Sequence, residues 1–196
     1  MIKISSTNRS NARQKHVSDY YVTPIEQIEI FLKEFNNDCN IFQKDNIKIL
    51  DCSAGGDLKH PMSYHRAIQN VFKREVDTLD IRDDSLAKIK SDYLTYDCKN
   101  KYDIIITNPP FKYAKEFILK ALDDIKEDGW VIFLLRLNFF GSKSRKFIWD
   151  NAMPLYTYVH HQRMSFRDDG KTDSIEYCHM CFKKSSNNKA SLLKVI

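Results

Sequence analysis

The chain has 196 residues, 42% of them hydrophobic and 29% charged, which is typical of one soluble globular domain with a full hydrophobic core. No apolar run is long enough to span a membrane, and residues 1–6 lack the apolar region of a signal peptide, so we expect a cytoplasmic protein with no membrane partner. The net charge of +5 does not by itself indicate a nucleic-acid partner, and five cysteines without framework spacing indicate reduced thiols rather than disulfides.

The first half of the chain alternates between helix and strand patterns. Residues 1–18 are polar and basic without an acid, and we expect a flexible tail before a single domain at 19–196. Thr23-Pro24 opens a predicted helix with apolar residues at helical spacing. The other elements predicted here are a strand at 47–50, a helix at 64–72, a strand at 76–79 and a third strand at 87–94.

The second half continues the alternation. Residues 102–107 contain the unbroken run Ile104-Ile105-Ile106, which predicts a strand buried on both faces. The remaining predicted elements are a helix at 114–126, a buried strand at 130–135, a helix through Trp149 capped by Ser142, and strands at 155–160 and 174–183. This order predicts an α/β fold with a mixed seven-stranded sheet, an antiparallel last strand and helices on both faces.

Polar residues follow several of these strands. In such sheets, ligands bind beyond the carboxyl ends of the strands, where we expect Asp51, Asp80, Asn108 and Arg136 to lie. Asp51 is followed by a turn of small residues at 52–56, which lets the backbone approach a ligand and offers free N–H groups. Asp80 stands where an acid commonly accepts hydrogen bonds from ribose hydroxyls. Taken alone, each is a weak signal, because ordinary turns and solvated carboxylates also follow strands.

The most informative stretch is Asn108-Pro109-Pro110-Phe111, directly after the strand at 102–107. A single proline would simply end the strand, but that explanation does not account for Asn108 or Phe111. The four residues resemble the catalytic motif of the amino-group methyltransferases that use S-adenosylmethionine, in which Asp or Asn is followed by two prolines and an aromatic residue. The position of the motif, after the fourth strand, matches that family too.

Other segments extend the resemblance. Residues 19–24 are similar to the short N-terminal motif that closes over the cofactor in the N6-adenine branch, and residues 91–94 to the acidic third-strand motif near the cofactor adenine. By general likeness, including 135–142 and 170–177, most of the chain resembles small N6-adenine methyltransferases of bacteriophages and mobile elements. The resemblance implies a Rossmann-like class I methyltransferase in a bacterial or phage-infected cell. Its substrate would be adenine N6 in nucleic acid, DNA being favoured over RNA.

The resemblance also implies roles for individual residues. The Asn108 side chain and the Pro109 carbonyl would accept the hydrogens of the adenine amino group, the two prolines would hold these acceptors rigidly, and Phe111 would stack on the base. The implied S-adenosylmethionine site comprises Tyr21, Thr23, Pro24, Asp51, Ser53, Ala54, Gly55, Asp80, Asp92, Tyr93 and Asn108. The predicted nucleic-acid contacts are Arg136, Asn138, Lys143, Arg145, Arg163 and Lys171, of which several belong to a basic, aromatic segment at 136–147.

Some alternatives stay open. Asp57 stands where the family's cofactor loop usually has glycine, and a carboxylate there is expected to crowd the methionine end of the site, which would suit a catalytically inactive relative. The motif also serves enzymes that methylate glutamine side chains, but those have longer N-terminal regions. Only about 85 residues follow the motif, so no large target-recognition domain is expected. Sequence specificity would then be short and supplied by the loops at 136–147 and 163–173, or it would come from a dimer mate or a partner subunit.

Two histidine and cysteine motifs are interpreted as structural. Cys178-His179-Met180-Cys181 contains a C-x-x-C pair, but on a strand these two cysteines point to opposite faces, and no second ligand pair has suitable spacing. We therefore predict no metal. His160-His161 is interpreted as surface or core filling rather than as a base or ligand.

Overall fold

The computed structural model describes residues 21–172 and 174–196, so the tail predicted at 1–18 lies outside the described residues. The strands are β1 (Ile49–Asp51), β2 (Asp77–Asp80), β3 (Ile89–Lys90), β4 (Ile104–Thr107), β5 (Trp130–Arg136), β6 (Tyr156–Val159), β7 (Tyr177–Lys183) and β8 (Leu192–Val195). The helices are α1 (Ile25–Cys39), α2 (Ser63–Phe72), α3 (Ala114–Asp124) and α4 (Lys146–Asn151). Short 3₁₀ turns occupy Ile41–Gln43, Phe111–Tyr113, Leu137–Phe140 and Lys143–Arg145. Within these described ranges, no helix has the length and apolar character that crossing a membrane requires.

All eight strands form one sheet in the order β3-β2-β1-β4-β5-β7-β6-β8. The first five in this order are parallel, and β7 inserts antiparallel between β5 and β6. Because β1, β2, β4 and β5 are parallel, their carboxyl ends meet at one edge. The structure thus confirms the prediction that Asp51, Asp80, Asn108 and Arg136 follow strands at a common edge.

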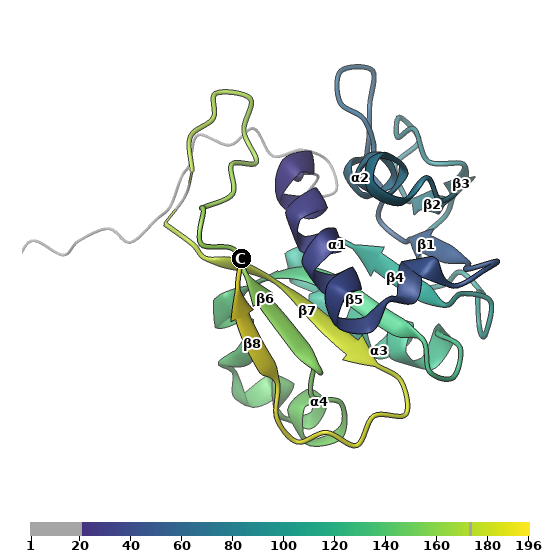
Figure 1. Cartoon of the computed structure of the whole chain (residues 1–196). Coiled ribbons are helices and arrows are strands. Elements are labelled where there is room, and N and C mark those ends of the chain that lie inside the picture. Colours follow the sequence, from purple (N-terminus) through teal and green to yellow (C-terminus); the bar gives the residue numbers. More distant parts are fainter. Residues whose placement is uncertain (1–20, 173) are drawn as a thin grey trace, which may run out of the picture.

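Helices cover both faces of the sheet, as predicted. α1 and α2 lie on one face, and α3 and α4 lie on the other (Figure 1). Each face has its own apolar core, because residues of the buried strands alternate between the two sides. In β5, for example, Val131 and Phe133 pack in the core beneath α3, whereas Ile132 and Leu134 pack beneath α1.

Three predicted elements need correction. Only Ile89–Lys90 of the strand predicted at 87–94 pairs with β2, because the backbone turns at Asp92, whose carbonyl oxygen accepts from the amides of Thr95 and Tyr96. Ser142 caps a 3₁₀ turn, accepting from the Ser144 amide, and α4 starts only after that turn. The helix predicted at 114–126 ends at Asp124, since Ile125 adopts an extended backbone.

An eighth strand, β8, was not predicted. It pairs parallel with β6 at the edge of the sheet and is tied to α1 through its one charged side chain. Lys194 Nζ donates to Asp38 Oδ2 at 2.6 Å, and the Tyr158 hydroxyl donates to the same oxygen at 2.5 Å. The strand thus depends on a partner that lies more than a hundred residues earlier in the chain.

A buried carboxylate fixes the start of β4. Asp103 accepts from the Lys48 amide at 2.9 Å, from Lys126 Nζ at 2.9 Å and from Lys44 Nζ at 3.2 Å. Burial alone would raise the pKa of Asp103, but these three donors hold it below its ordinary value. The carboxylate therefore joins the segments before β1, before β4 and after α3.

We expect Asp103→Asn to lower the free energy of unfolding at pH 7 by about 1–3 kcal/mol, because the amide cannot replace the charged hydrogen bonds. Since the folded-state pKa is depressed, this contribution is present above about pH 4 and is lost as the pH falls further. Urea unfolding at pH 7 and pH 3 measures both effects. The matched control is Asp45→Asn on the exposed turn nearby. Equal losses in the two variants at pH 7 would contradict the role of Asp103.

Candidate functional site

A cavity of about 630 Å³ opens at the carboxyl edge of the parallel strands. Its wall contains most of the residues predicted to bind a cofactor, namely Tyr21, Thr23, Ser53, Ala54, Asp80, Asp92, Tyr93 and Asn108. Pro109 and Pro110 line it as well, so the predicted catalytic motif and the predicted cofactor loop face one cavity. Pro24, Asp51, Gly55 and Phe111 are outside the lining, although each lies next to a lining residue in the chain.

The small-residue loop after β1 is held by Asp80. Asp80 Oδ2 accepts from the Gly55 amide at 2.7 Å, while Oδ1 accepts from the Arg82 amide at 2.9 Å. Gly55 and Gly56 have φ of 64° and 76°, a conformation that favours glycine. A Cβ on Gly56 would also lie 2.7 Å from the Met62 side chain. Gly56 in particular is therefore needed, because a side chain there would be strained and would meet Met62 beside the cavity.

Asp51 lies behind this loop rather than in the cavity. It is buried, and its Oδ1 accepts from the Thr107 hydroxyl at 2.7 Å, which joins the ends of β1 and β4. Its Oδ2 has no hydrogen-bond partner among the described residues. Burial raises the pKa of Asp51 to about 7, with a smaller contribution from the negative charge of Asp80.

The Asn108 side chain presents an unsatisfied acceptor at the cavity wall. Asn108 Nδ2 donates to Thr23 Oγ1 at 3.0 Å, which fixes the orientation of the amide. Asn108 Oδ1 is buried and has no hydrogen-bond partner in the part of the chain described. A buried acceptor without a donor costs about 1–3 kcal/mol, so a ligand that donates a hydrogen bond here would relieve that cost.

Phe111 lies beside the cavity in an aromatic cluster. The Arg136 guanidinium carbon is 4.8 Å from the Phe111 ring centroid, a cation–π distance, and the Tyr177 ring is 6.0 Å from it. Phe166 packs on Tyr177 at 4.8 Å and reaches Tyr21, which lines the cavity, at 6.2 Å. The cluster connects the catalytic motif with the long 160–176 segment.

Of the residues predicted to contact nucleic acid, only Arg136 touches the catalytic motif. Its Nε is buried without a hydrogen-bond partner among the described residues. Arg145 instead braces its own loop, donating to the carbonyls of Phe139 and Gly141. The other four lie at exposed positions outside the cavity lining: Asn138, Lys143, Arg163, which pairs with Glu176 at 3.4 Å, and Lys171, which lies 3.7 Å from Asp169.

The expectation that Asp57 crowds the cavity is wrong. Its carboxylate turns into its own loop, where Oδ1 accepts from the amides of Lys59 and His60, each at 2.8 Å. Burial alone would raise the pKa of Asp57, but these amides and the His60 ring lower it. Gly56, rather than Asp57, lines the cavity, so the acid stabilises the turn and leaves the site open.

The histidines and cysteines behave as predicted from their strand positions. Cys178 and Cys181 belong to the two different cores on opposite faces of the sheet. His160 is buried and lies 2.9 Å from His179, which in turn lies 2.9 Å from the Tyr64 hydroxyl. Burial lowers the pKa of His160 to about 4, so it is neutral and fills the core. Among residues 21–172 and 174–196, no cluster of His, Cys, Asp and Glu could hold a metal ion.

Several lining residues were not predicted. They are Cys52, Gly56, Ser63, Tyr64, Ile81, Arg82, Leu94, Lys112, Tyr113 and Phe117. Half of them, namely Cys52, Gly56, Ile81, Leu94 and Lys112, are direct neighbours of predicted residues, so adjacency to the motifs was the available signal. Ser63, Tyr64 and Phe117 lie further along the chain, and their place depends on how α2 and α3 dock onto the sheet.

No protein-family model matches the sequence, and no curated protein matches it either. Solved structures do share its architecture. A Listeria monocytogenes protein described as a class I S-adenosylmethionine-dependent methyltransferase superposes with a TM-score of 0.66 and 16% identity, over 93% of this chain and 68% of that one. The type I restriction-modification methyltransferase subunit from Streptococcus thermophilus gives a TM-score of 0.68 and 13% identity, over 92% and 48%.

A third similar structure is a Pyrococcus horikoshii protein described as an RNA methyltransferase, with a TM-score of 0.62 and 16% identity over 87% of this chain and 90% of that one. The chain spans about two thirds of the Listeria protein and about half of the Streptococcus subunit. Together these likenesses establish the Rossmann-like fold of class I methyltransferases, as the sequence predicted.

Asp51→Asn tests the buried carboxylate behind the loop. The folded-state pKa is about 7, against about 3.9 in an unfolded chain, so the native state binds more protons between these values. Wild-type stability should therefore fall as the pH rises from about 4 to about 7, by a few kcal/mol at most, because one pKa unit corresponds to about 1.4 kcal/mol. In Asp51→Asn this fall should be smaller.

Thermal unfolding measured in steps of one unit at about pH 5, 6, 7 and 8 would show how the pH dependence of stability differs between wild type and Asp51→Asn. Asp83→Asn, an exposed neighbour of the next strand end, is the control and should follow the wild-type profile. Parallel pH profiles for wild type and Asp51→Asn would show that Asp51 does not titrate in this range.

Proposed function

We propose that the protein is an S-adenosylmethionine-dependent methyltransferase that methylates the N6 amino group of adenine in nucleic acid, most readily DNA. The observation that carries this proposal is the unsatisfied Asn108 Oδ1, which lies at the wall of the cavity that the loop after β1 also lines. A planar amino group offers two donors, and Asn108 Oδ1 is an acceptor without a donor among the described residues. The fold is that of class I methyltransferases, which supports the proposal.

The residues around the cavity suit S-adenosylmethionine. Asp80 would also accept from ribose hydroxyls, since a carboxylate oxygen that accepts one backbone hydrogen bond, from Gly55 or from Arg82, has a second lone pair. Asp92 and Tyr93 would flank the adenine of the cofactor, and the loop from Ser53 to Gly56 would let the methionine part approach the backbone. When bound, the cofactor supplies an electrophilic methyl group on its sulfonium.

Asn108 and Pro109 would then prepare the acceptor nitrogen. The lone pair of an exocyclic amino group is delocalised into the adenine ring, and it must localise on nitrogen for attack on the methyl group. Acceptors fixed on both amino hydrogens favour the tetrahedral geometry that this requires, without acting as a strong base. The prolines keep the acceptors in place, because both φ angles are restricted and neither nitrogen can donate.

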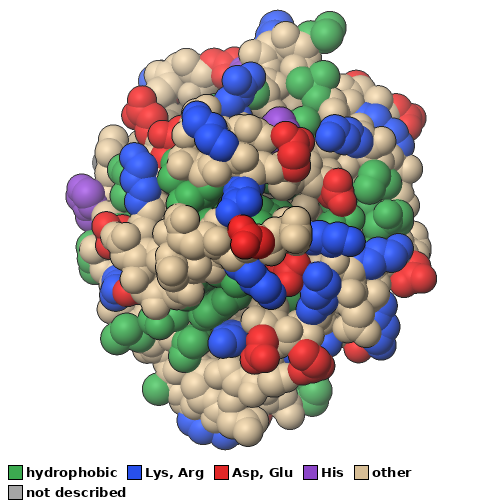
Figure 2. Space-filling model, turned by 45° about the vertical axis from the view of Figure 1, so that its right-hand side comes forward, with side chains coloured by type: hydrophobic (Ala, Val, Ile, Leu, Met, Phe, Trp, Pro, Cys, Tyr) green, Lys and Arg blue, Asp and Glu red, His purple; other side chains and the backbone are tan. Residues whose placement is uncertain are grey.

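The surface drawn in Figure 2 does not offer a nucleic acid a uniformly basic patch. On the face shown in Figure 2, Lys and Arg side chains are intermixed with Asp and Glu, and neither sign forms a continuous band. Arg136, with its partner Phe111, is then the contact closest to the chemistry, while Asn138, Lys143, Arg163 and Lys171 would touch the strand further out. We expect such an enzyme to work in the cytoplasm of a bacterial or phage-infected cell.

Target specificity would come from the loops at 136–147 and 163–173, or from a partner. The restriction-modification subunit that shares the fold is about twice as long as the matched region. A second copy of this chain or a partner subunit would then add to the recognition surface. The exposed aliphatic side chains Leu192, Leu193 and Val195 on the edge strand β8 suit such an association.

Asn108→Ala should lower kcat for methylation by about 10²–10³-fold, the usual effect of removing one preorganised polar group from a transition state. Labelled S-adenosylmethionine is incubated with separate DNA and RNA pools, and the modified base is identified after digestion. Label in N6-methyladenine from DNA is the expected result. Label found only in adenine from RNA would show that RNA is the substrate. The similar Pyrococcus horikoshii structure is described as an RNA methyltransferase.

Asn70→Ala is the matched control, because the side chain of this exposed asparagine on α2 donates to Glu29 at the surface, outside the cavity lining. It should keep wild-type activity. Label that appears equally with Asn108→Ala, or that appears only in protein, would refute the assignment to nucleic-acid amino groups.

Phe111→Leu tests the stacking role separately. Loss of one aromatic platform costs about 1–3 kcal/mol, so kcat/KM for the nucleic acid should fall about 5- to 150-fold. Affinity for S-adenosylmethionine should change little, because Phe111 does not line the cavity. Phe111→Trp, which keeps a stacking surface, should retain most activity. A parallel loss of cofactor affinity would show that Phe111 acts by shaping the cavity instead.

A further inference from the structure

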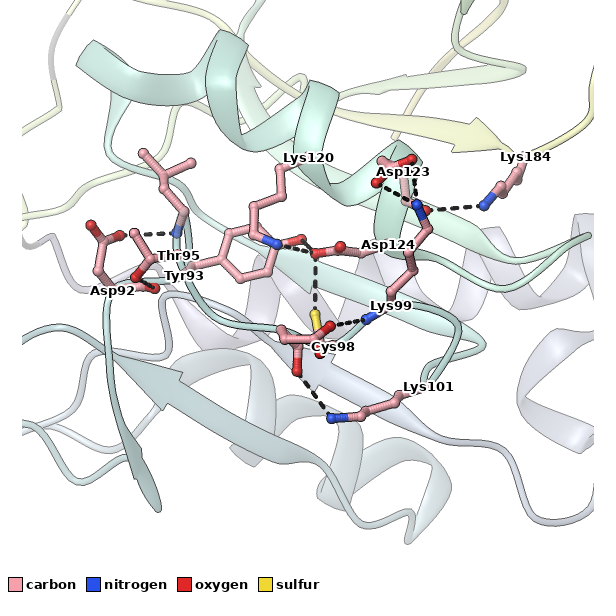
Figure 3. A network of polar contacts seen from close by, with 12 residues as sticks. Asp92, Tyr93, Thr95, Cys98, Lys99, Lys101, Lys120, Asp123, Asp124 and Lys184 are labelled. Carbon is pink, nitrogen blue, oxygen red and sulfur yellow. Dashed lines mark hydrogen bonds and ion pairs between the residues drawn. The ribbon is translucent and has the colours of Figure 1, made fainter.

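Asp124, at the end of α3, collects three donors on one buried oxygen. Asp124 Oδ2 accepts from Lys120 Nζ at 2.6 Å, from the Tyr93 hydroxyl at 3.2 Å and from the Cys98 thiol at 3.2 Å (Figure 3). The carboxylate is nearly inaccessible, and so are Tyr93 and Cys98. Within this network only Tyr93 belongs to the motifs that predicted the site.

Both neutral donors keep their protons at ordinary pH. Burial, with the nearby Asp124 carboxylate, raises the pKa of Cys98 to about 12 and also raises that of Tyr93. Lys120 makes two contacts in the network. Its Nζ donates to Asp124 and also lies 5.0 Å from the centre of the Tyr93 ring, a cation–π distance. The orientation of the Tyr93 ring is therefore fixed at its hydroxyl and at its face.

Tyr93 lies in a wall of the cavity that has little strand pairing with the sheet. β3 pairs with β2 through only two residues, and the chain then turns through 91–102 before β4 begins. Two hydrogen bonds tie the ends of this segment to β2, from the Ser91 amide to the Asp80 carbonyl and from the Tyr102 hydroxyl to Asp77. Between those ends, its hydrogen bonds to the rest of the protein converge on the end of α3. The Asn100 amide donates to the Asp124 carbonyl at 2.6 Å, in addition to the side-chain network.

The same helix begins at the catalytic motif. The 3₁₀ turn Phe111–Tyr113 follows Pro110 directly, with the Tyr113 amide donating to the Pro110 carbonyl at 2.8 Å, and α3 continues from there. On its inner face, Phe117 lines the cavity and packs against Tyr93 at 5.1 Å. α3 therefore links the motif at Asn108 to the wall at Asp92 and Tyr93.

We propose that Asp124 is a positioning residue for cofactor binding: it holds the Tyr93 hydroxyl and so fixes the 91–97 turn that forms one wall of the cofactor cavity. This inference rests on the proposed function, since it takes S-adenosylmethionine as the ligand of the cavity. Asp124 touches neither cofactor nor substrate. Its effect is confined to the affinity for the cofactor, because Asn108 is positioned by β4 and Thr23.

Calorimetric titration of the full chain with S-adenosylmethionine tests this role. Asp124→Asn should raise the Kd about tenfold, the effect of losing a hydrogen bond to a charged group. Tyr93→Phe, which keeps the ring and removes only the hydroxyl, should raise the Kd about threefold, because this variant loses only the hydrogen bond to Asp124. The double variant should bind no worse than Asp124→Asn alone, because both changes break one contact. kcat at saturating cofactor should stay within about twofold of wild type.

Asp123→Asn is the matched control, since this neighbouring acid is exposed and pairs with Lys99 at the surface. It should leave the Kd unchanged. If Asp124→Asn fails to fold, Tyr93→Phe alone decides, because its ring still fills the core. Wild-type Kd values in folded Asp124→Asn or Tyr93→Phe, or a lower kcat with unchanged Kd, would overturn the inference while leaving the proposed function intact. Wild-type protein that does not bind S-adenosylmethionine would overturn both.

Discussion

The hydrogen bond from the Thr107 hydroxyl to Asp51 joins the carboxyl ends of the two central strands, and the functional edge is built around it. β1 and β4 are short and buried on both faces, so the directions in which the chain leaves them are set at these two residues. After Asp51 the chain forms the glycine loop, and after Thr107 it enters Asn108 and the prolines. The bond therefore sets the spacing between the loop and the motif that face each other across the cavity.

Unsatisfied polar atoms in this protein gather at the same edge. Asp51 Oδ2, Asn108 Oδ1 and Arg136 Nε are buried without hydrogen-bond partners among the described residues. Elsewhere, buried polar groups such as Asp103 and Asp124 are fully engaged by several donors. A fold that satisfies its structural carboxylates but leaves acceptors and a donor open beside one cavity is organised for a ligand there.

Sequence reasoning was most successful where a pattern is local. The run Ile104–Ile106 predicted β4, the glycine pair predicted the loop, and alternation along β7 placed Cys178 and Cys181 on opposite faces. It failed where particular hydrogen bonds, local or distant, decide the course of the chain or the direction of a side chain. The segment 87–94 has strand-like residues, yet Asp92 turns the backbone. β8 pairs with β6 and its Lys194 contacts Asp38 on α1, contacts between residues far apart in the sequence. Asp57 does not crowd the cavity because the amides of Lys59 and His60 donate to its carboxylate.

The sequence by itself determined the fold class and the polar residues that end or follow the central strands, because strand periodicity acts within a few residues. It also predicted the catalytic motif, through its resemblance to the amino-group methyltransferases. Only the tertiary structure decided which of those residues face the cavity, that Arg136 lies on Phe111, and that Asp124 supports Tyr93 from another element. These relations join residues that are close in space but separated along the chain. Side-chain packing and burial, which no local pattern encodes, set them.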